Sequence, residues 1–304
     1  MMNRNQNRIR QFCGLLCVWL LCAAGCSPAA VPSESESPER TVVVPETVLQ
    51  TTAEDTAAPM TAGPSTAAPS EAPSQTAEVI LPLSGLTVCL DPGHQSKGNS
   101  EKEPCAPWGP EKNEHYNNTV LKNKCASGTE GVQTGIAEYI VTLQISLKLR
   151  DALAALGAEV VLTRASHNVN LSNIERAEIA NKCNADITLR IHCNGSENQS
   201  ASGILIISRG AGDGSEAYSA LAARDYAYAS ALSKALLGAT AARNDGLWQS
   251  DAYTGINWAQ NTCLIVECGY MSNPAEDMLL TSPEYQEKLI SGFVAFFCGL
   301  KEIP

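Results

Sequence analysis

From residue 85 onward, short apolar runs alternate with longer segments that mix apolar and polar residues. The runs have the length and content of β-strands that are buried on both faces. The predicted strands are 86–90, 158–163, 187–191, 203–208 and 262–266. The predicted helices are 136–156, 172–183, 216–237 and 283–299. This alternation predicts an α/β fold: a single domain, residues 85–304, with a twisted, mostly parallel β-sheet covered by helices on both faces.

Residues 1–26 differ from this pattern. Three arginines within the first ten residues precede the apolar run 12–25, which is too short for a membrane-spanning helix and predicts an export signal. The run closes with AAGC, which resembles the lipobox of bacterial lipoproteins, so we expect Cys26 to be lipidated and to anchor the chain to the membrane. Ordinary cleavage near Gly25 is the alternative and would give a secreted protein. In both cases the mature chain works at the extracellular face of the membrane or in the cell wall.

Residues 27–84 are rich in Ser, Thr, Ala and Pro, and this composition predicts a disordered tether. The net charge of −11 disfavours nucleic acid as a partner. Four of the twelve cysteines belong to the signal, and six others lie in apolar contexts typical of buried thiols. Cys105 and Cys125 remain, both in the irregular insertion 95–130, and they are the one pair to consider for a disulfide.

Three of the predicted strands are followed by a side chain that can bind a metal ion or transfer a proton. His94 follows the first strand after the turn DPG, His192 follows the third strand, and Glu267 follows the last. Ligands of open α/β sheets bind at the carboxyl ends of the strands. We therefore expect these three groups to contribute to one site.

A fourth group, Glu138, stands near the start of the helix 136–156 among apolar neighbours. The helix dipole alone would explain a carboxylate there, but a partly buried carboxylate also needs a partner, which a metal ion would supply. Two His and one Glu, with the fourth position left to water, form the ligand set of a hydrolytic zinc site. His94, Glu138 and His192 are therefore candidate zinc ligands. Because no short zinc motif is present, the residues alone do not exclude the alternative that these side chains are structural polar groups without a metal.

Thiolate ligands are excluded by the alternation of side chains along a strand. If His192 and Glu267 face the site, the neighbouring Cys193 and Cys268 face away from it. Glu267 has three possible roles: a partner for a histidine ring, a fourth ligand, or a general base. We favour the general base, which takes a proton from water as the water attacks a carbonyl.

Five ordered segments resemble the zinc-dependent N-acetylmuramoyl-L-alanine amidases that cleave bacterial cell walls. They are LDPGH at 90–94, AE at 137–138, SNIER at 172–176, the stretch from AD at 185–186 to RIHCN at 190–194, and IVECGYMSNP at 265–274. The resemblance covers residues 85–304. It implies that His94, Glu138 and His192 bind one Zn²⁺ and that Glu267 is catalytic. It also implies hydrolysis of the peptidoglycan amide between the lactyl group of N-acetylmuramic acid and L-alanine.

Two other functions are compatible with such a domain: a non-catalytic peptidoglycan-binding or regulatory lipoprotein, and a zinc peptidase that acts on stem peptides. We expect the insertion 95–130 to form a wall or lid of the substrate groove, and it is long enough to hold a helix that plugs the zinc. Asn194, Trp108 and Trp258 are candidate substrate-binding residues. Arg176, on the predicted helix 172–183, could pair with Glu175 or Glu178 or brace the site, but we favour an exposed residue of an amphipathic helix.

Overall fold

The computed structural model describes residues 80–300. The predicted signal, Cys26 and nearly all of the predicted tether lie outside these residues. Six strands form the central sheet in the order β4-β1-β5-β8-β6-β7. Their bounds are β1 Thr87–Pro92, β4 Glu159–Leu162, β5 Ile187–Asn194, β6 Ile204–Ser208, β7 Asn244–Gln249 and β8 Thr262–Tyr270. All neighbouring pairs are parallel except β6 and β8, which are antiparallel, so the predicted mostly parallel sheet is confirmed.

The helices form two unequal layers. The larger layer consists of α1 (Glu138–Ala155), α3 (Glu216–Thr240) and α6 (Pro283–Cys298), whose apolar side chains share the main core with the sheet. The other face carries α2 (Asn173–Lys182) and the four-residue α4 (Thr254–Asn257), each with a small apolar cluster. The short helix α5 (Pro274–Leu280) follows β8. None of the helices within residues 80–300 is long and apolar enough to cross a membrane.

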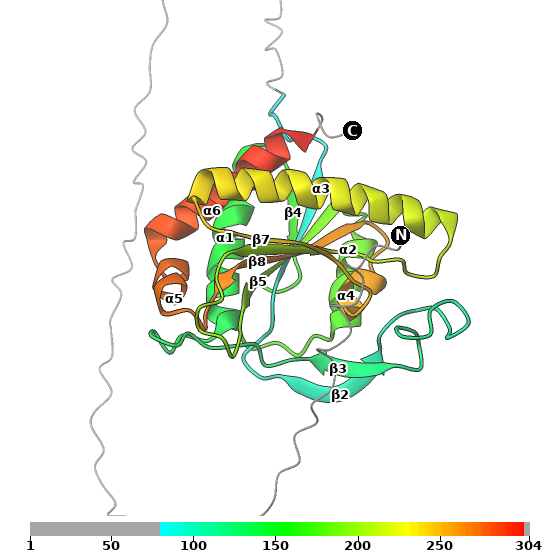
Figure 1. Cartoon of the computed structure of the whole chain (residues 1–304). Helices are drawn as coiled ribbons and strands as arrows, with labels where there is room; N and C mark the ends of the chain where they lie inside the picture. The colour runs from blue at the N-terminus through cyan, green and yellow to red at the C-terminus, as the bar shows by residue number, and fades with distance from the viewer. Residues whose placement is uncertain (1–79, 301–304) are drawn as a thin grey trace, which may run out of the picture. The chain divides into compact units, whose positions relative to one another are not determined.

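The insertion contains a separate two-stranded antiparallel ribbon, β2 (Asn99–Pro104) and β3 (Leu121–Cys125). Figure 1 shows this ribbon apart from the central sheet, at the opposite end of the molecule from α3 and α6. Between positions 95 and 130 the structure holds no helix, so the insertion does not contain the plugging helix for which it has the length. A polar ribbon is present instead, and much of its surface is exposed.

Alternation along the central strands decides which side chains can reach the site. In β5, Ile187, Leu189 and Ile191 belong to the main core beneath the larger helical layer. The residues between them, ending with His192, point to the other face. In β8, Val266 and Cys268 belong to the main core, whereas Cys263 and Ile265 pack on the α4 side. His192 and Glu267 therefore share the face that has the thinner helical cover.

The residues just before β1 also pack on the domain. Residues 82–85 form a turn, and Leu83 is buried in the main core although it lies within the predicted tether. Its backbone N–H donates to the carbonyl of Leu156, at the end of α1, at 2.9 Å. Leu83 therefore packs as part of the domain, although it stands at the end of the predicted tether.

Candidate metal centre

His94 occupies a strained backbone position directly after β1. Its φ of +59° lies in the left-handed region, which is uncommon for residues other than glycine. Two buried arginines hold the turn in place. Arg164 donates to the carbonyls of Pro92 and Gly93, both at 2.9 Å. Arg176 donates to the carbonyls of Pro92 and His94, both at 3.0 Å. These four hydrogen bonds fix the backbone that aims the His94 ring.

Glu138 is the first residue of α1, and its side chain is only 3% exposed. One carboxylate oxygen, Oε1, accepts from the backbone N–H of Cys193, and Oε2 accepts from that of Thr129, both at 3.0 Å. Burial alone would raise the pKa of Glu138, but hydrogen bonds and opposite charge from His192 and His94 lower it far below its usual value. Glu138 is therefore a rigid carboxylate that stays ionised.

The two predicted histidines converge on this carboxylate. His94 Nε2 lies 3.1 Å from Glu138 Oε2, and His192 Nδ1 lies 3.0 Å from Glu138 Oε1. The two imidazole rings meet edge to face, with centroids 4.8 Å apart. The other nitrogen of His94, Nδ1, lies 2.8 Å from the carbonyl oxygen of Ala126, which favours the tautomer with Nε2 free to act as a ligand. The structure thus brings together all three predicted ligands.

The spacing of these atoms fits a zinc ion. One ligand atom from each of His94, Glu138 and His192 can be chosen so that all lie within 4.8 Å of one another. Tetrahedral Zn²⁺ with bonds of about 2.0–2.1 Å keeps neighbouring ligand atoms about 3.3 Å apart. Each histidine lies at a similar distance, 3.0–3.1 Å, from one oxygen of Glu138: His94 from Oε2 and His192 from Oε1. Two imidazole nitrogens and one carboxylate oxygen also leave one coordination position open.

Glu267 lies beside this cluster, paired in register with His192 across β5 and β8. Its Oε2 is buried and has no hydrogen-bond partner among residues 80–300. Burial raises the pKa of the Glu267 carboxyl to about 8, and the charge of Glu138 adds to this, whereas His94 opposes it. A carboxyl with a buried, unpaired oxygen next to a ligand cluster is unfavourable for the fold alone and is typical of a functional group.

A network of buried charges lies beneath the site. Asp91 accepts hydrogen bonds from Arg176 and from Arg190, both at 2.7 Å, and is only 1% exposed. Arg176 itself is 2% exposed, so the prediction that it lies on an exposed helix face is wrong. The polar Asp91 and Arg190 within otherwise apolar strands were the signal in the sequence. They could have indicated a buried ion pair, but not the second arginine, Arg176 on α2, that also pairs with Asp91.

The insertion packs against α2 and reaches the site. Glu103 of β2 accepts from the backbone N–H groups of Asn173 and Ile174, at the start of α2. Residues of the ribbon, among them Lys122 of β3, line a cavity of about 540 Å³ together with His94 and Glu267. The ribbon therefore forms one wall of the cavity that holds the candidate catalytic groups.

The disulfide considered between Cys105 and Cys125 is absent, since both are free thiols. Cys125 lies opposite Asn99 in the ribbon, whereas the backbone N–H of Cys105 bonds to Val120 at the other end. Five residues of strand separate these positions, roughly 16 Å, and a disulfide requires Cα atoms less than about 7 Å apart.

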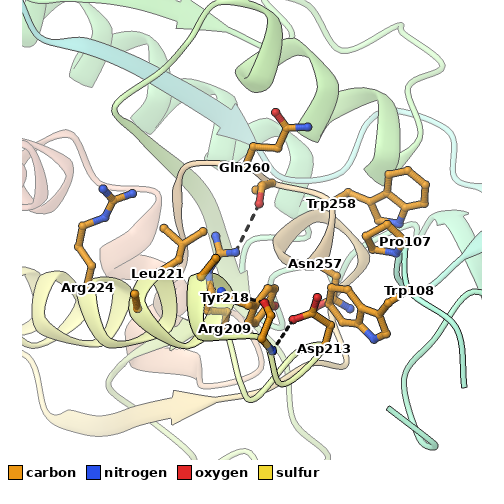
Figure 2. A pocket seen from close by; sticks show the side chains of 14 residues that line it. Pro107, Trp108, Arg209, Asp213, Tyr218, Leu221, Arg224, Asn257, Trp258 and Gln260 are labelled. Atoms are coloured by element: carbon orange, nitrogen blue, oxygen red, sulfur yellow. Dashed lines mark hydrogen bonds between the residues drawn. The ribbon is translucent and has the colours of Figure 1, made fainter. Parts of the chain in front are cut away.

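The three candidate substrate-binding residues divide between two places. Asn194 lines a hollow with His94, Glu138 and Glu267, at the rim of the cluster. Trp108 and Trp258 line a different cavity, between the insertion, α3 and α4, to which neither His94 nor Glu267 contributes (Figure 2). The two tryptophans therefore lie together, as residues of a hollow separate from the metal cluster.

Comparison with known proteins gives the family. Residues 88–296 match the family model described as N-acetylmuramoyl-L-alanine amidase. The chain belongs to this amidase family. The family resemblance predicted from the five ordered segments is thereby confirmed, and so is the prediction of an enzyme.

Individual relatives of this amidase agree with the assignment. An N-acetylmuramoyl-L-alanine amidase of Mycobacterium tuberculosis is 30% identical over 227 residues, which cover 71% of this chain and 87% of that protein. A germination-specific N-acetylmuramoyl-L-alanine amidase of Bacillus subtilis is 25% identical, covering 74% of this chain and 85% of that protein. The crystal structure of the amidase Ami1 from Mycobacterium smegmatis superimposes with a TM-score of 0.59 and 26% identity, covering 71% of this chain and 98% of that one. These relatives support a peptidoglycan amidase.

Proposed function

We propose that this amidase is a zinc enzyme that hydrolyses the amide between the lactyl group of N-acetylmuramic acid and L-alanine in peptidoglycan. In this proposal His94, Glu138 and His192 hold one Zn²⁺ and Glu267 is the catalytic carboxylate. The observation that carries it is the convergence of the first three side chains, whose ligand atoms lie within 4.8 Å of one another, beside a carboxyl whose buried oxygen lacks a protein partner. When bound, Zn²⁺ polarises the substrate carbonyl and lowers the pKa of water towards about 7.

Glu267 moves the proton in this mechanism. Its carboxylate takes a proton from the water that attacks the lactyl carbonyl carbon. The C–N bond then breaks, and the same carboxyl gives that proton to the nitrogen of L-alanine, which leaves as a free amino terminus. Burial holds the pKa of Glu267 near 8, close to the working pH, which suits a group that must accept and release a proton.

The remaining residues position these groups. Arg164 and Arg176 hold the His94 turn through backbone carbonyls, and the N–H groups of Thr129 and Cys193 hold both oxygens of Glu138. Asn194, at the rim, is placed to contact substrate. Because ligand orientation depends on such supporting contacts, we expect them to matter for metal affinity as well as for stability.

Digestion of purified muropeptides, with products identified by mass, tests this function. Amidase action releases free L-alanine amino termini and intact glycan, and it should stop with a chelator and return with added Zn²⁺. Release of a terminal amino acid instead would identify a stem-peptide peptidase. No product under any condition would favour a non-catalytic wall-binding protein.

Two variants separate the roles of the site residues. Glu267→Gln should lose hydrolysis while it retains zinc, because the ligand set is intact. His94→Ala should lose both hydrolysis and zinc, measurable by metal analysis of the purified protein. Full turnover by the Glu267→Gln variant would contradict the general-base role.

We further propose that the enzyme is exported and anchored through a lipid on Cys26, because its substrate lies outside the membrane and AAGC closes an apolar leader. Metabolic labelling with a fatty-acid analogue should mark the parent chain but not a Cys26→Ala variant. An unlabelled parent chain in the culture medium would favour a secreted enzyme.

A further inference from the structure

A second hollow, outside the metal cluster, is a cavity of about 850 Å³ between the insertion, the first half of α3 and α4. Its volume lies within the range of about 300–1,000 Å³ that is usual for small-ligand sites. Figure 2 shows Trp108 and Trp258 at one end of this cavity and Leu221 and Arg224 of α3 at the other. Neither its residues nor its position is explained by the catalytic mechanism.

The two tryptophans are held as rigid platforms. The ring N–H of Trp108 donates to the carbonyl of Tyr116 at 2.7 Å, and that of Trp258 donates to the carbonyl of Pro104 at 3.3 Å. Because both indole N–H groups already have partners in the insertion, each ring presents only carbon to the cavity. Tyr218 packs edge to face on Trp108, with ring centroids 5.2 Å apart, and extends the aromatic wall.

Two polar groups of the same wall lack partners. Asn257 is 3% exposed, and its amide nitrogen donates to the carbonyls of Cys105 and Asp251, which leaves Oδ1 unpaired within the described part of the chain. The hydroxyl of Tyr218 is likewise buried and unpaired there. A buried polar group without a hydrogen-bond partner is unfavourable for the fold. Both atoms are covered in the free protein, so a ligand could reach them only after a small side-chain shift.

The charges around the cavity favour a neutral ligand. Arg224 and Asp213 line it with opposite charges. The third charged group, Arg209, is fully buried, and Asp225 pairs with its guanidinium. A ligand that offers apolar faces to indole rings, and N–H and O–H groups to a buried amide oxygen and a hydroxyl, has the chemistry of an N-acetylated sugar.

The cavity also adjoins the metal site. Ala252, Tyr253 and Thr254 line the cavity that contains Glu267, whereas Asn257 and Trp258, a few residues further along the same segment, line the aromatic cavity. The insertion contributes to both cavities as well, with Lys122 on one side and Trp108 on the other. A polymer bound at the metal site can therefore reach the aromatic cavity around this shared wall.

We propose that this aromatic cavity is a second glycan-binding site, which holds an N-acetylhexosamine unit of the peptidoglycan strand away from the amide being cleaved. An indole face stacks on the apolar face of the sugar ring, and the acetamido N–H donates to Asn257 Oδ1. The choice of glycan rests on the proposed function, because peptidoglycan is the polymer that this amidase meets.

The test uses the metal-loaded enzyme and two neutral tetrasaccharides with the same β-1,4 linkage. One is built of N-acetylglucosamine, and the other, cellotetraose, has a hydroxyl in place of each acetamido group. Neither carries a stem peptide, so neither is hydrolysed. Binding is followed by quenching of tryptophan fluorescence, because two of the four tryptophans line the cavity. We expect saturable quenching at millimolar N-acetylglucosamine tetramer and at least tenfold weaker binding of cellotetraose.

Two matched variants locate the binding. Ala220 and Ala223 are both exposed on α3, but only Ala220 lines the cavity, so Ala220→Phe fills it and Ala223→Phe does not. Binding should weaken at least tenfold in Ala220→Phe and be unchanged in Ala223→Phe. The Ala220→Phe variant should also show a higher KM for polymeric peptidoglycan.

Several outcomes would overturn the proposal: no quenching in the parent, equal binding of cellotetraose, unchanged binding in Ala220→Phe, or displacement of the sugar by a free stem peptide. Amidase turnover without sugar binding would refute this site and leave the proposed function intact. Sugar binding by a protein that releases no L-alanine termini would refute the proposed function and leave this binding site intact.

Discussion

Replacement of Asp91 by Asn would show how strongly the buried charges support the metal site. Asp91 is 1% exposed and pairs with both Arg176 and Arg190 at 2.7 Å. The Asn variant keeps the shape of the side chain but leaves two buried guanidinium groups without a negative partner. Breaking a buried ion pair from one side costs about 3–5 kcal/mol. For a domain of this size each kcal/mol lowers Tm by about 2–4 °C, so we expect a decrease of roughly 6–20 °C.

Thermal unfolding followed by circular dichroism measures this effect, with Asp151→Asn as the matched control. Asp151 also pairs with an arginine, Arg150, at 2.8 Å, but both side chains are exposed, so its loss should change Tm little. A decrease in the Asp91→Asn variant no larger than that of the control would refute the reasoning. It would mean that water reaches and solvates the arginines under the site.

The stability difference between the parent and the Asp91→Asn variant should also depend on pH. Burial alone would raise the pKa of Asp91, but the charges of Arg176 and Arg190 lower it well below its ordinary value of 3.8. The unfolded chain therefore takes up this proton first as the pH falls. The stabilisation by Asp91 is complete above pH 3.8 and declines at lower pH. The difference in stability between the parent and the Asn variant should narrow below about pH 4.

Three further predictions follow from single contacts. Gly93→Ala should lose bound zinc while it stays folded, because the added Cβ would lie 2.5 Å from the His192 ring; metal analysis checks this against Gly238→Ala, whose Cβ meets nothing within 4 Å. Glu103→Ala should destabilise the domain by about 0.5–2 kcal/mol, because two backbone N–H groups at the start of α2 lose their acceptor. Glu101→Ala, at an exposed position of β2, should not destabilise it. Unfolding by denaturant compares the stability of the two variants. In the chelated protein, the stability of Glu267→Gln relative to the parent should increase as the pH rises from 4.5 to 8. The reason is that folding raises the pKa of Glu267 from 4.5 to about 8, so ionisation of this glutamate destabilises the folded parent over that range. A difference in Tm between the two proteins that stays constant from pH 4.5 to 8 would contradict this prediction.

The central strands could be predicted because the sheet is covered on both faces, so each strand is a nearly continuous apolar run. The edge strand β7, with the sequence NDGLWQ, was missed for the same physical reason, since it is largely exposed or half-buried and shows no such run. The ribbon strands β2 and β3 were missed because they are polar. The helices α4 and α5 have four and seven residues, too few for a helical period to be visible.

The candidate metal ligands and the catalytic carboxylate could be predicted from the sequence, but the residues that hold them in position could not. His94, His192 and Glu267 each interrupt an apolar strand at its carboxyl end, and that interruption can be read without a structure. Arg176 could not be assigned in this way, because its partner Asp91 lies 85 residues earlier and only the packing of α2 on β1 brings them together. The aromatic cavity was hidden for a similar reason, since Trp108 and Trp258 are 150 positions apart in the sequence.

The unequal cover of the sheet explains why the chemistry gathers where it does. The face beneath α1, α3 and α6 is filled mainly by apolar side chains. The opposite face is covered only by α2, the four-residue α4 and the polar ribbon, and the strand residues that point to it include Asp91, Arg190 and His192. Charged groups there can pair with one another near the middle of the sheet and face a cavity at its carboxyl edge.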